Sequence, residues 1–143
     1  MKRSTVLAAS VIVVVAIAAG VFASGQGAVK AEFDPDVGWV ILNTTASGKL
    51  ICSAHIIDGL PNEEFSVSVR VRYEDGIVDV HQDIATLKTN GQGKGNIQVK
   101  VDIAPPDGST TLRRVAFRLR RPGPPNILYN AIVWDIPLKT HSE

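Results

Sequence analysis

Arginines cluster in one short segment near the C-terminal end of the chain. Five of the eight arginines fall within nine consecutive residues. Alternation along this segment places Arg114, Arg118 and Arg120 on one face of a strand whose other face is apolar. Arg70 and Arg72 lie on a second strand and extend the set. Guanidinium groups pair bidentately with phosphate, sulfate or carboxylate, so we predict a binding face for an anionic ligand.

The ligand of this arginine segment is expected to be an anionic polymer or a protein partner at the cell surface. An acidic cell-wall polymer, a glycan or a lipid headgroup would supply the anions. Nucleic acid is not expected, because the chain carries a net charge of +1 and Phe117 points inward rather than offering a ring for stacking. The alternative is that these arginines protect an edge strand or pair across the sheet with Glu74, Asp79 and Asp83.

A second candidate site consists of alternating metal-ligating residues. Asp79, His81 and Asp83 would lie on one face of a strand, and oxygen and nitrogen donors at that spacing suit a divalent metal. The alternative is a solvated face near a hairpin that pairs with Arg70 or Arg72. The metal site is therefore the second hypothesis.

Other motifs do not indicate catalysis or a cofactor. Ser53, His55 and Asp79 would form a catalytic triple on paper, but any sandwich offers such sets. Residues 90–95 are glycine-rich, yet they lack the phosphate-loop spacing and the helix that must follow. Asn43 begins a glycosylation acceptor pattern. We expect no enzyme activity and no cofactor.

The N-terminal segment decides on which side of a membrane these residues work. Lys2 and Arg3 precede an uncharged apolar run over residues 5–23, and small residues around Ala23 fit cleavage before Ser24. Residues 1–23 are thus a signal peptide, or a membrane anchor through residues 5–23 if uncleaved. Either way the following domain faces outside, extracellular or membrane-anchored. A buried helix of a cytosolic protein is the alternative, but the run lacks a polar face.

The rest of the chain reads as one all-β domain. Residues 24–36 form a linker, and residues 37–139 form the domain. Period-two alternation and turn residues predict strands at 37–43, 49–57, 65–74, 77–82, 84–89, 97–103, 111–120 and 127–136. Asp75-Gly76 predicts a type I′ hairpin that joins two of these strands.

Seven or eight short strands without a helical period favour an immunoglobulin-like antiparallel β-sandwich with Greek-key connections. A closed barrel is the alternative. Leu112 is out of phase with the residues that follow it, which predicts a bulge near Arg113 and Arg114. Cys52 is the one cysteine, so no intrachain disulfide is possible, and alternation places it in the core.

Two turn-and-strand motifs, Gly59–Val69 and Leu87–Gly95, occur in this order after the export segment. Together they resemble secreted prokaryotic Greek-key β-sandwich domains of unknown function. The resemblance covers roughly residues 38–138 and implies fold and export, with no chemistry attached. The sequence therefore predicts an exported non-enzymatic surface or extracellular interaction module that binds an anionic ligand through the arginine-rich strand. A metal-binding sandwich domain is the alternative.

Overall fold

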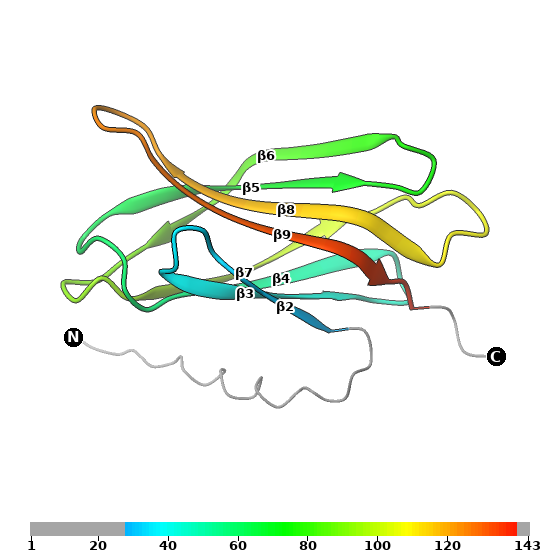
Figure 1. The fold of residues 1–143 in the computed structure, drawn as a ribbon, viewed down its shortest axis with the longest axis horizontal. Helices are drawn as coiled ribbons and strands as arrows, with labels where there is room; N and C mark the ends of the chain where they lie inside the picture. The colour runs from blue at the N-terminus through cyan, green and yellow to red at the C-terminus, as the bar shows by residue number, and fades with distance from the viewer. Residues whose placement is uncertain (1–27, 140–143) are drawn as a thin grey trace.

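The computed structural model describes residues 28–139 as eight β-strands in two antiparallel sheets (Figure 1). The strands are β2 (Val29–Glu32), β3 (Gly38–Thr44), β4 (Lys49–Ile56), β5 (Glu64–Arg72), β6 (Val78–Lys88), β7 (Gly95–Asp102), β8 (Thr111–Arg121) and β9 (Ile127–Pro137). The predicted signal peptide or anchor lies outside the described residues. Within residues 28–139, no helix has the length and apolar character needed to cross a membrane.

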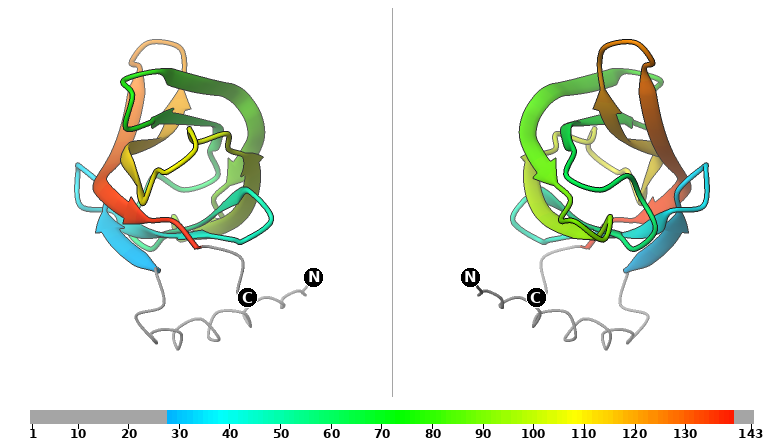
Figure 2. Two further views of the ribbon diagram at one scale, coloured as in Figure 1. Left: turned by 90° about the vertical axis from the view of Figure 1, so that its right-hand side faces the viewer. Right: turned by 90° about the vertical axis from the view of Figure 1, so that its left-hand side faces the viewer.

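The two sheets pack face to face around one hydrophobic core (Figure 2). One sheet has the order β2-β3-β4-β7 and the other the order β6-β5-β8-β9. Alternate residues point inward along most of each strand, as in β4 and β5, so the core takes about every second side chain. Its largest fully buried members are Phe65, Phe117, Leu42, Leu50, Ile56, Leu87, Leu112, Leu119 and Ile136.

Cys52 is a core residue, as predicted. It is fully buried on β4, and burial raises the pKa of its thiol to about 12. A thiol with that pKa stays protonated at neutral pH and behaves as a small apolar side chain.

One side of the sandwich is joined by backbone bonds between the sheets. Asp34 and Asn130 form an isolated antiparallel bridge, with N–H to O distances of 2.7 and 3.1 Å. At the far end of β3, the buried hydroxyl of Thr44 donates to the carbonyl oxygen of Pro137 at 2.9 Å. These bonds fix β9 against β2 and β3.

The predicted linker at residues 24–36 contains a strand. Its residues Val29–Glu32 pair in register with Trp39–Leu42 of β3. The segment is too short to show alternation clearly and is flanked by turn residues, which is why the sequence pattern did not identify it.

The two strands predicted at 77–82 and 84–89 are one strand, β6, with a bulge in the middle. Val69 of β5 faces His81, whereas Val67 faces Ala85, so β6 contains two more residues than β5 over this stretch. Asp83 has a φ of 53° in the bulge. The bulge interrupts the alternation of inward and outward residues, so the sequence pattern indicated two strands in place of one.

The hairpin between β5 and β6 has a different turn from the predicted type I′. A type I′ turn needs positive φ at both central residues, but here Gly76 has a φ of 89° and Asp75 is not in this region. The N–H of Gly76 donates to the carbonyl of Tyr73 at 2.9 Å. This is the three-residue loop that ends in a left-handed glycine.

β8 changes phase near Arg113 and Arg114, but without the predicted bulge. Leu112 pairs with Ile136 and Arg114 with Trp134, so neither strand has an extra residue here. Leu112 and Val115 are both fully buried although they are three residues apart, and Arg113 and Arg114 lie between them. On the partner strand Asp135 has a φ of 55° at the same level. The phase change keeps both apolar residues in the core and turns Arg114 to the outer face.

Candidate anion-binding face

The arginines of β5 and β8 lie together on the outer face of the β6-β5-β8-β9 sheet. Their neighbours in sequence, such as Val71 and Phe117, are fully buried, so the arginines between them point away from the core. We name this set the arginine face; it consists of Arg70, Arg72, Arg114, Arg118 and Arg120. The structure thus brings together all five arginines that the sequence predicted as ligand-binding.

The strand register sets the spacing of the arginine face. Arg72 lies directly opposite Arg114, and Arg70 lies opposite Ala116. Arg118 and Arg120 are opposite serines of β5. Directly opposite like charges destabilise a sheet, so this arrangement has a cost in the absence of an anion.

A shallow depression of about 190 Å³ lies in the middle of this face. Ala116 and Ser68 are small, which leaves room between the longer side chains around them. Four guanidinium groups contribute to its lining, from Arg70, Arg114, Arg118 and Arg120, and Asp83 adds a carboxylate. A hollow lined by several planar cationic donors matches the geometry of phosphate, sulfate and carboxylate groups.

Among residues 28–139, no ion pair neutralises a member of the arginine face. The arginines of this region that do pair are Arg113, 3.7 Å from Asp135, and Arg121, 3.0 Å from Glu63. The Nε of Arg114 is buried without a hydrogen-bond partner. These five guanidinium groups therefore keep most of their donors free.

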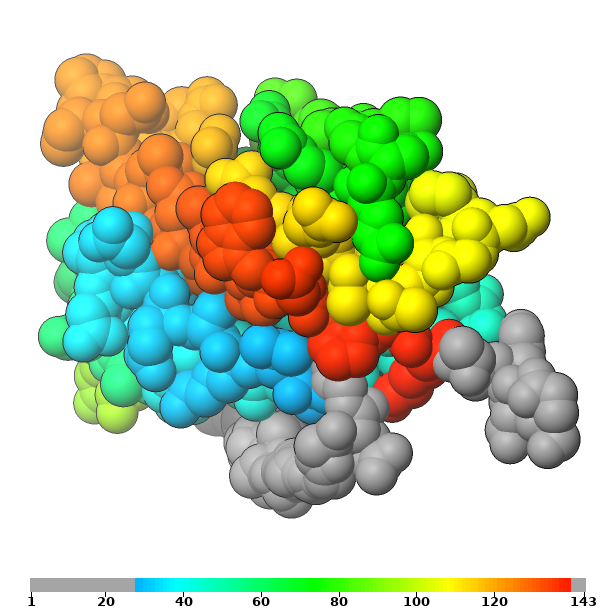
Figure 3. Space-filling model, turned by 45° about the vertical axis from the view of Figure 1, so that its right-hand side comes forward, coloured from blue at the N-terminus to red at the C-terminus, as the bar shows by residue number. Residues whose placement is uncertain are grey.

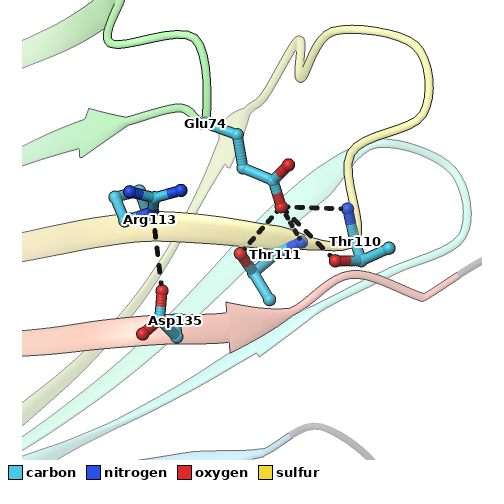
Figure 4. A network of polar contacts seen from close by, with 5 residues as sticks. All are labelled: Glu74, Thr110, Thr111, Arg113 and Asp135. Carbon is cyan, nitrogen blue, oxygen red and sulfur yellow. Dashed lines mark hydrogen bonds and ion pairs between the residues drawn. The ribbon is translucent and has the colours of Figure 1, made fainter.

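The carboxylates expected to pair with these arginines have other partners. Glu74 accepts hydrogen bonds from the backbone N–H groups of Thr110 and Thr111 at 3.1 and 3.0 Å and from both hydroxyls (Figure 4). These bonds, the Thr111 N–H first, lower the pKa of Glu74. Asp79 accepts from the Tyr73 hydroxyl at 2.5 Å. The alternative of cross-strand pairing was wrong for these two carboxylates.

Two arginines make contacts that orient them within the face. The Arg114 guanidinium lies 5.3 Å from the centre of the Trp134 ring, a cation–π contact. The Nε of Arg118 donates to the Asn130 side-chain oxygen at 3.2 Å. Each contact leaves terminal N–H groups available, because a guanidinium has five donors.

The proposed metal ligands do not share a face. Asp79 and His81 are opposite the buried Val71 and Val69, so both point to the inner side of β6. The bulge turns Asp83 to the outer side, where it accepts from the Ser66 hydroxyl at 2.5 Å. No group of three or more His, Cys, Asp or Glu side chains within residues 28–139 is placed to hold a metal. The expected row of three ligands was wrong because the bulge interrupts the alternation.

Tyr73 and Asp79 form a polar pair at the inner side of β6 that the sequence analysis missed. Burial and the Asp79 bond raise the pKa of Tyr73 to about 12. The Tyr73 hydroxyl also accepts from the Ala104 N–H at 2.9 Å. The pair connects β6 to the segment after β7, a structural role.

The three residues considered as a catalytic triple do not lie together. Ser53 and His55 belong to β4 in one sheet, whereas Asp79 belongs to β6 in the other. His55 stacks on Trp39 at 5.3 Å between ring centroids, and burial lowers its pKa. Asn43 is half-buried on β3, and residues 90–94 form the loop between β6 and β7.

Comparisons with protein-family models, with curated proteins and with solved structures found no match for this chain. The resemblance to secreted Greek-key domains therefore stays a prediction.

Proposed function

We propose that the chain is an exported, non-enzymatic interaction module that binds an anionic ligand through the arginine face. The observation that carries the proposal is the gathering of five guanidinium groups without ion-pair partners in the described chain on one face, four of which line one depression. The arginines repel one another across the sheet, and no carboxylate within residues 28–139 compensates their charge. A site for an external anion requires such free positive charge.

We also infer that the sandwich is immunoglobulin-like and follows an N-terminal signal or anchor helix. The connections from β4 to β5, from β6 to β7 and from β7 to β8 each pass from one sheet to the other, which supports a Greek-key arrangement. The export part rests on the sequence of residues 1–23. Intact masses from membrane and medium fractions test it: a form starting at Ser24 in the medium indicates cleavage, and a full-length form in the membrane indicates an anchor.

Retention on a heparin column tests the anion-binding proposal. The protein should elute at a salt concentration well above that of the double variant Arg70→Gln/Arg120→Gln, since both side chains are exposed and contribute to the lining of the depression. The matched control is Lys94→Gln/Lys100→Gln, which removes two exposed positive charges from elsewhere on the molecule.

The control variant should elute close to the parent protein. Equal decreases in elution salt for both double variants would mean that heparin binding depends on net charge alone. If the parent protein were not retained, the arginine face would have no affinity for this anion. Either result contradicts the proposal.

A further inference from the structure

Apolar side chains flank the arginine face at both edges of its sheet. Cross-strand register aligns residues from β6, β5, β8 and β9 in rows on the outer face. Two neighbouring rows are Val78–Arg72–Arg114–Trp134 and Val80–Arg70–Ala116–Ile132. Each row has an aliphatic or aromatic side chain at either end and at least one arginine between them.

These flanking side chains are widely exposed. The exposed fractions are 52% for Val80, 44% for Ile132 and 60% for Trp134. With Val78 and Leu128, five of the nine exposed large hydrophobic residues within 28–139 lie on this one face. Concentration of exposed apolar surface on one face of a small domain marks an interaction site.

The pattern of charge and apolar surface discriminates between possible occupants. A hydrated polyanion would satisfy the arginines but leave the aliphatic edges in water. A second copy docked face to face about a two-fold axis would bring arginines against arginines. An anionic bilayer offers phosphate groups for the guanidinium groups and, just below them, an apolar layer for Val80, Ile132 and Trp134. Tryptophan also favours this boundary.

The start of the described chain lies near the C-terminal half of β9. β2 (blue) and β9 (red) lie next to each other in Figure 3. The Asp34–Asn130 bridge is antiparallel, so the residues before Asp34 run alongside those after Asn130, and the beginning of β2 lies towards the end of β9 that carries Trp134. Five residues of sequence separate Val29 from the apolar run predicted to enter the membrane. A short connection at this edge would favour contact between the face and a bilayer.

We propose that the arginine face docks on an anionic phospholipid surface, with headgroup phosphates in the central depression and the apolar side chains of β6 and β9 in the headgroup–acyl boundary. This inference rests on the proposed anion-binding function and names the source of the anion. The protein then lies with the outer face of the β6-β5-β8-β9 sheet against the membrane.

Fluorescence of Trp134 tests this inference in the full chain. Trp39 lies on the other sheet, stacked on His55, so a Trp39→Phe variant reports from Trp134 alone. Vesicles of phosphatidylglycerol and phosphatidylcholine should shift its emission to the blue, whereas phosphatidylcholine alone should not. Because the signal comes from Trp134, insertion of the N-terminal segment does not produce it. A Trp134→Phe variant, which retains Trp39, should show no shift.

Variants separate the ionic from the apolar contribution. Arg70→Gln/Arg120→Gln should lower the equilibrium constant for docking by about thirty-fold, the effect expected of two basic residues at an anionic membrane. Val80→Ser/Ile132→Ser should weaken docking on vesicles and leave heparin retention unchanged. The matched control Ile57→Ser/Leu60→Ser, which removes exposed apolar side chains from a loop, should change neither.

The outcomes distinguish this inference from the proposed function. Heparin retention without a Trp134 shift on anionic vesicles overturns membrane docking and leaves anion binding in place. An equal shift on phosphatidylcholine alone also overturns it, since charge would then be irrelevant. Absence of both retention and shift removes both proposals.

Discussion

At the scale of single residues, Glu74 gives the clearest dependence of stability on pH. Its hydrogen bonds from Thr110 and Thr111 hold its folded-state pKa below the ordinary value of 4.5. A lowered folded-state pKa means that the bonds stabilise the fold above pH 4.5 and that this contribution disappears as the pH falls through the folded-state pKa.

We therefore expect Glu74→Gln to be less stable than the parent protein at neutral pH, with a difference that shrinks as the medium is acidified below pH 4.5. Urea unfolding midpoints measured from pH 7 down to pH 3 check this expectation. A difference that stays constant over that range would show that the carboxylate charge contributes nothing to the contact.

The outward position of the arginines was predictable from the sequence, whereas the positions and partners of the nearby carboxylates were not. Simple alternation about buried valines and Phe117 is enough to place the arginines outside. Asp83 escaped the same reasoning because its side depends on two extra residues that the β5 partner lacks. Register is a property of a strand pair, and alternation within one strand does not contain it.

At the scale of elements, loops at one end of the sandwich pack closely through glycines. The N–H of Gly59 donates to the carbonyl of Gly93 at 3.0 Å, and the N–H of Asn62 donates to the carbonyl of Asn90 at 2.9 Å. These loops belong to the two motifs that suggested the family resemblance. The contact between these two distant segments explains why the run is rich in glycine. The spacing of residues in the sequence alone did not explain it.

Gly93→Ala should destabilise the domain far more than Gly76→Ala. Both glycines have positive φ, 78° and 89°, so alanine at either position costs about 1–2 kcal/mol from the backbone alone. A Cβ at Gly93 would lie 2.1 Å from the carbonyl oxygen of Gly59, whereas one at Gly76 meets no atom within 4 Å. Denaturant unfolding of the two variants isolates the steric contribution. Equal losses would mean that the loops move apart without cost.

The strand list was largely predictable because inward and outward residues alternate along most of each strand, with interruptions in β6, β8 and β9. β2 was not predicted: its four residues alternate, but so short a segment between turn formers carries too little pattern to be assigned. Its existence depends on β3, which supplies the hydrogen-bonding edge, and on the Asp34–Asn130 bridge, which holds its end. Such a strand is fixed by tertiary contacts, which local propensity does not report.

At the scale of the whole molecule, the two faces of one sheet have separate roles. The inner face of β6-β5-β8-β9 forms half of the core, and the outer face gathers uncompensated charge between apolar edges. A net charge of +1 for the chain hides this local concentration, because carboxylates elsewhere balance it in the sum. The net charge therefore argued against nucleic acid as the ligand, while the arrangement of the arginines argues for a local anion site.

This separation predicts opposite effects of one substitution on stability and on binding. Arg72 is exposed, has no ion pair within residues 28–139 and lies directly opposite Arg114. Arg72→Gln should raise the free energy of unfolding by about 0.2–1 kcal/mol at low salt, because it removes a like-charge cross-strand pair. The gain should shrink at high salt as the repulsion is screened. Heparin retention should fall in the same variant.

Urea unfolding at low and high salt, with Lys100→Gln as the matched single-charge control, measures the stability effect. Lys100 is exposed on β7 and faces Ile51, so its loss should leave stability nearly unchanged. A less stable Arg72→Gln variant at low salt would mean that the arginine serves the fold. A more stable variant that binds heparin less well would mean that the chain retains this charge for a ligand, since the fold alone is better without it.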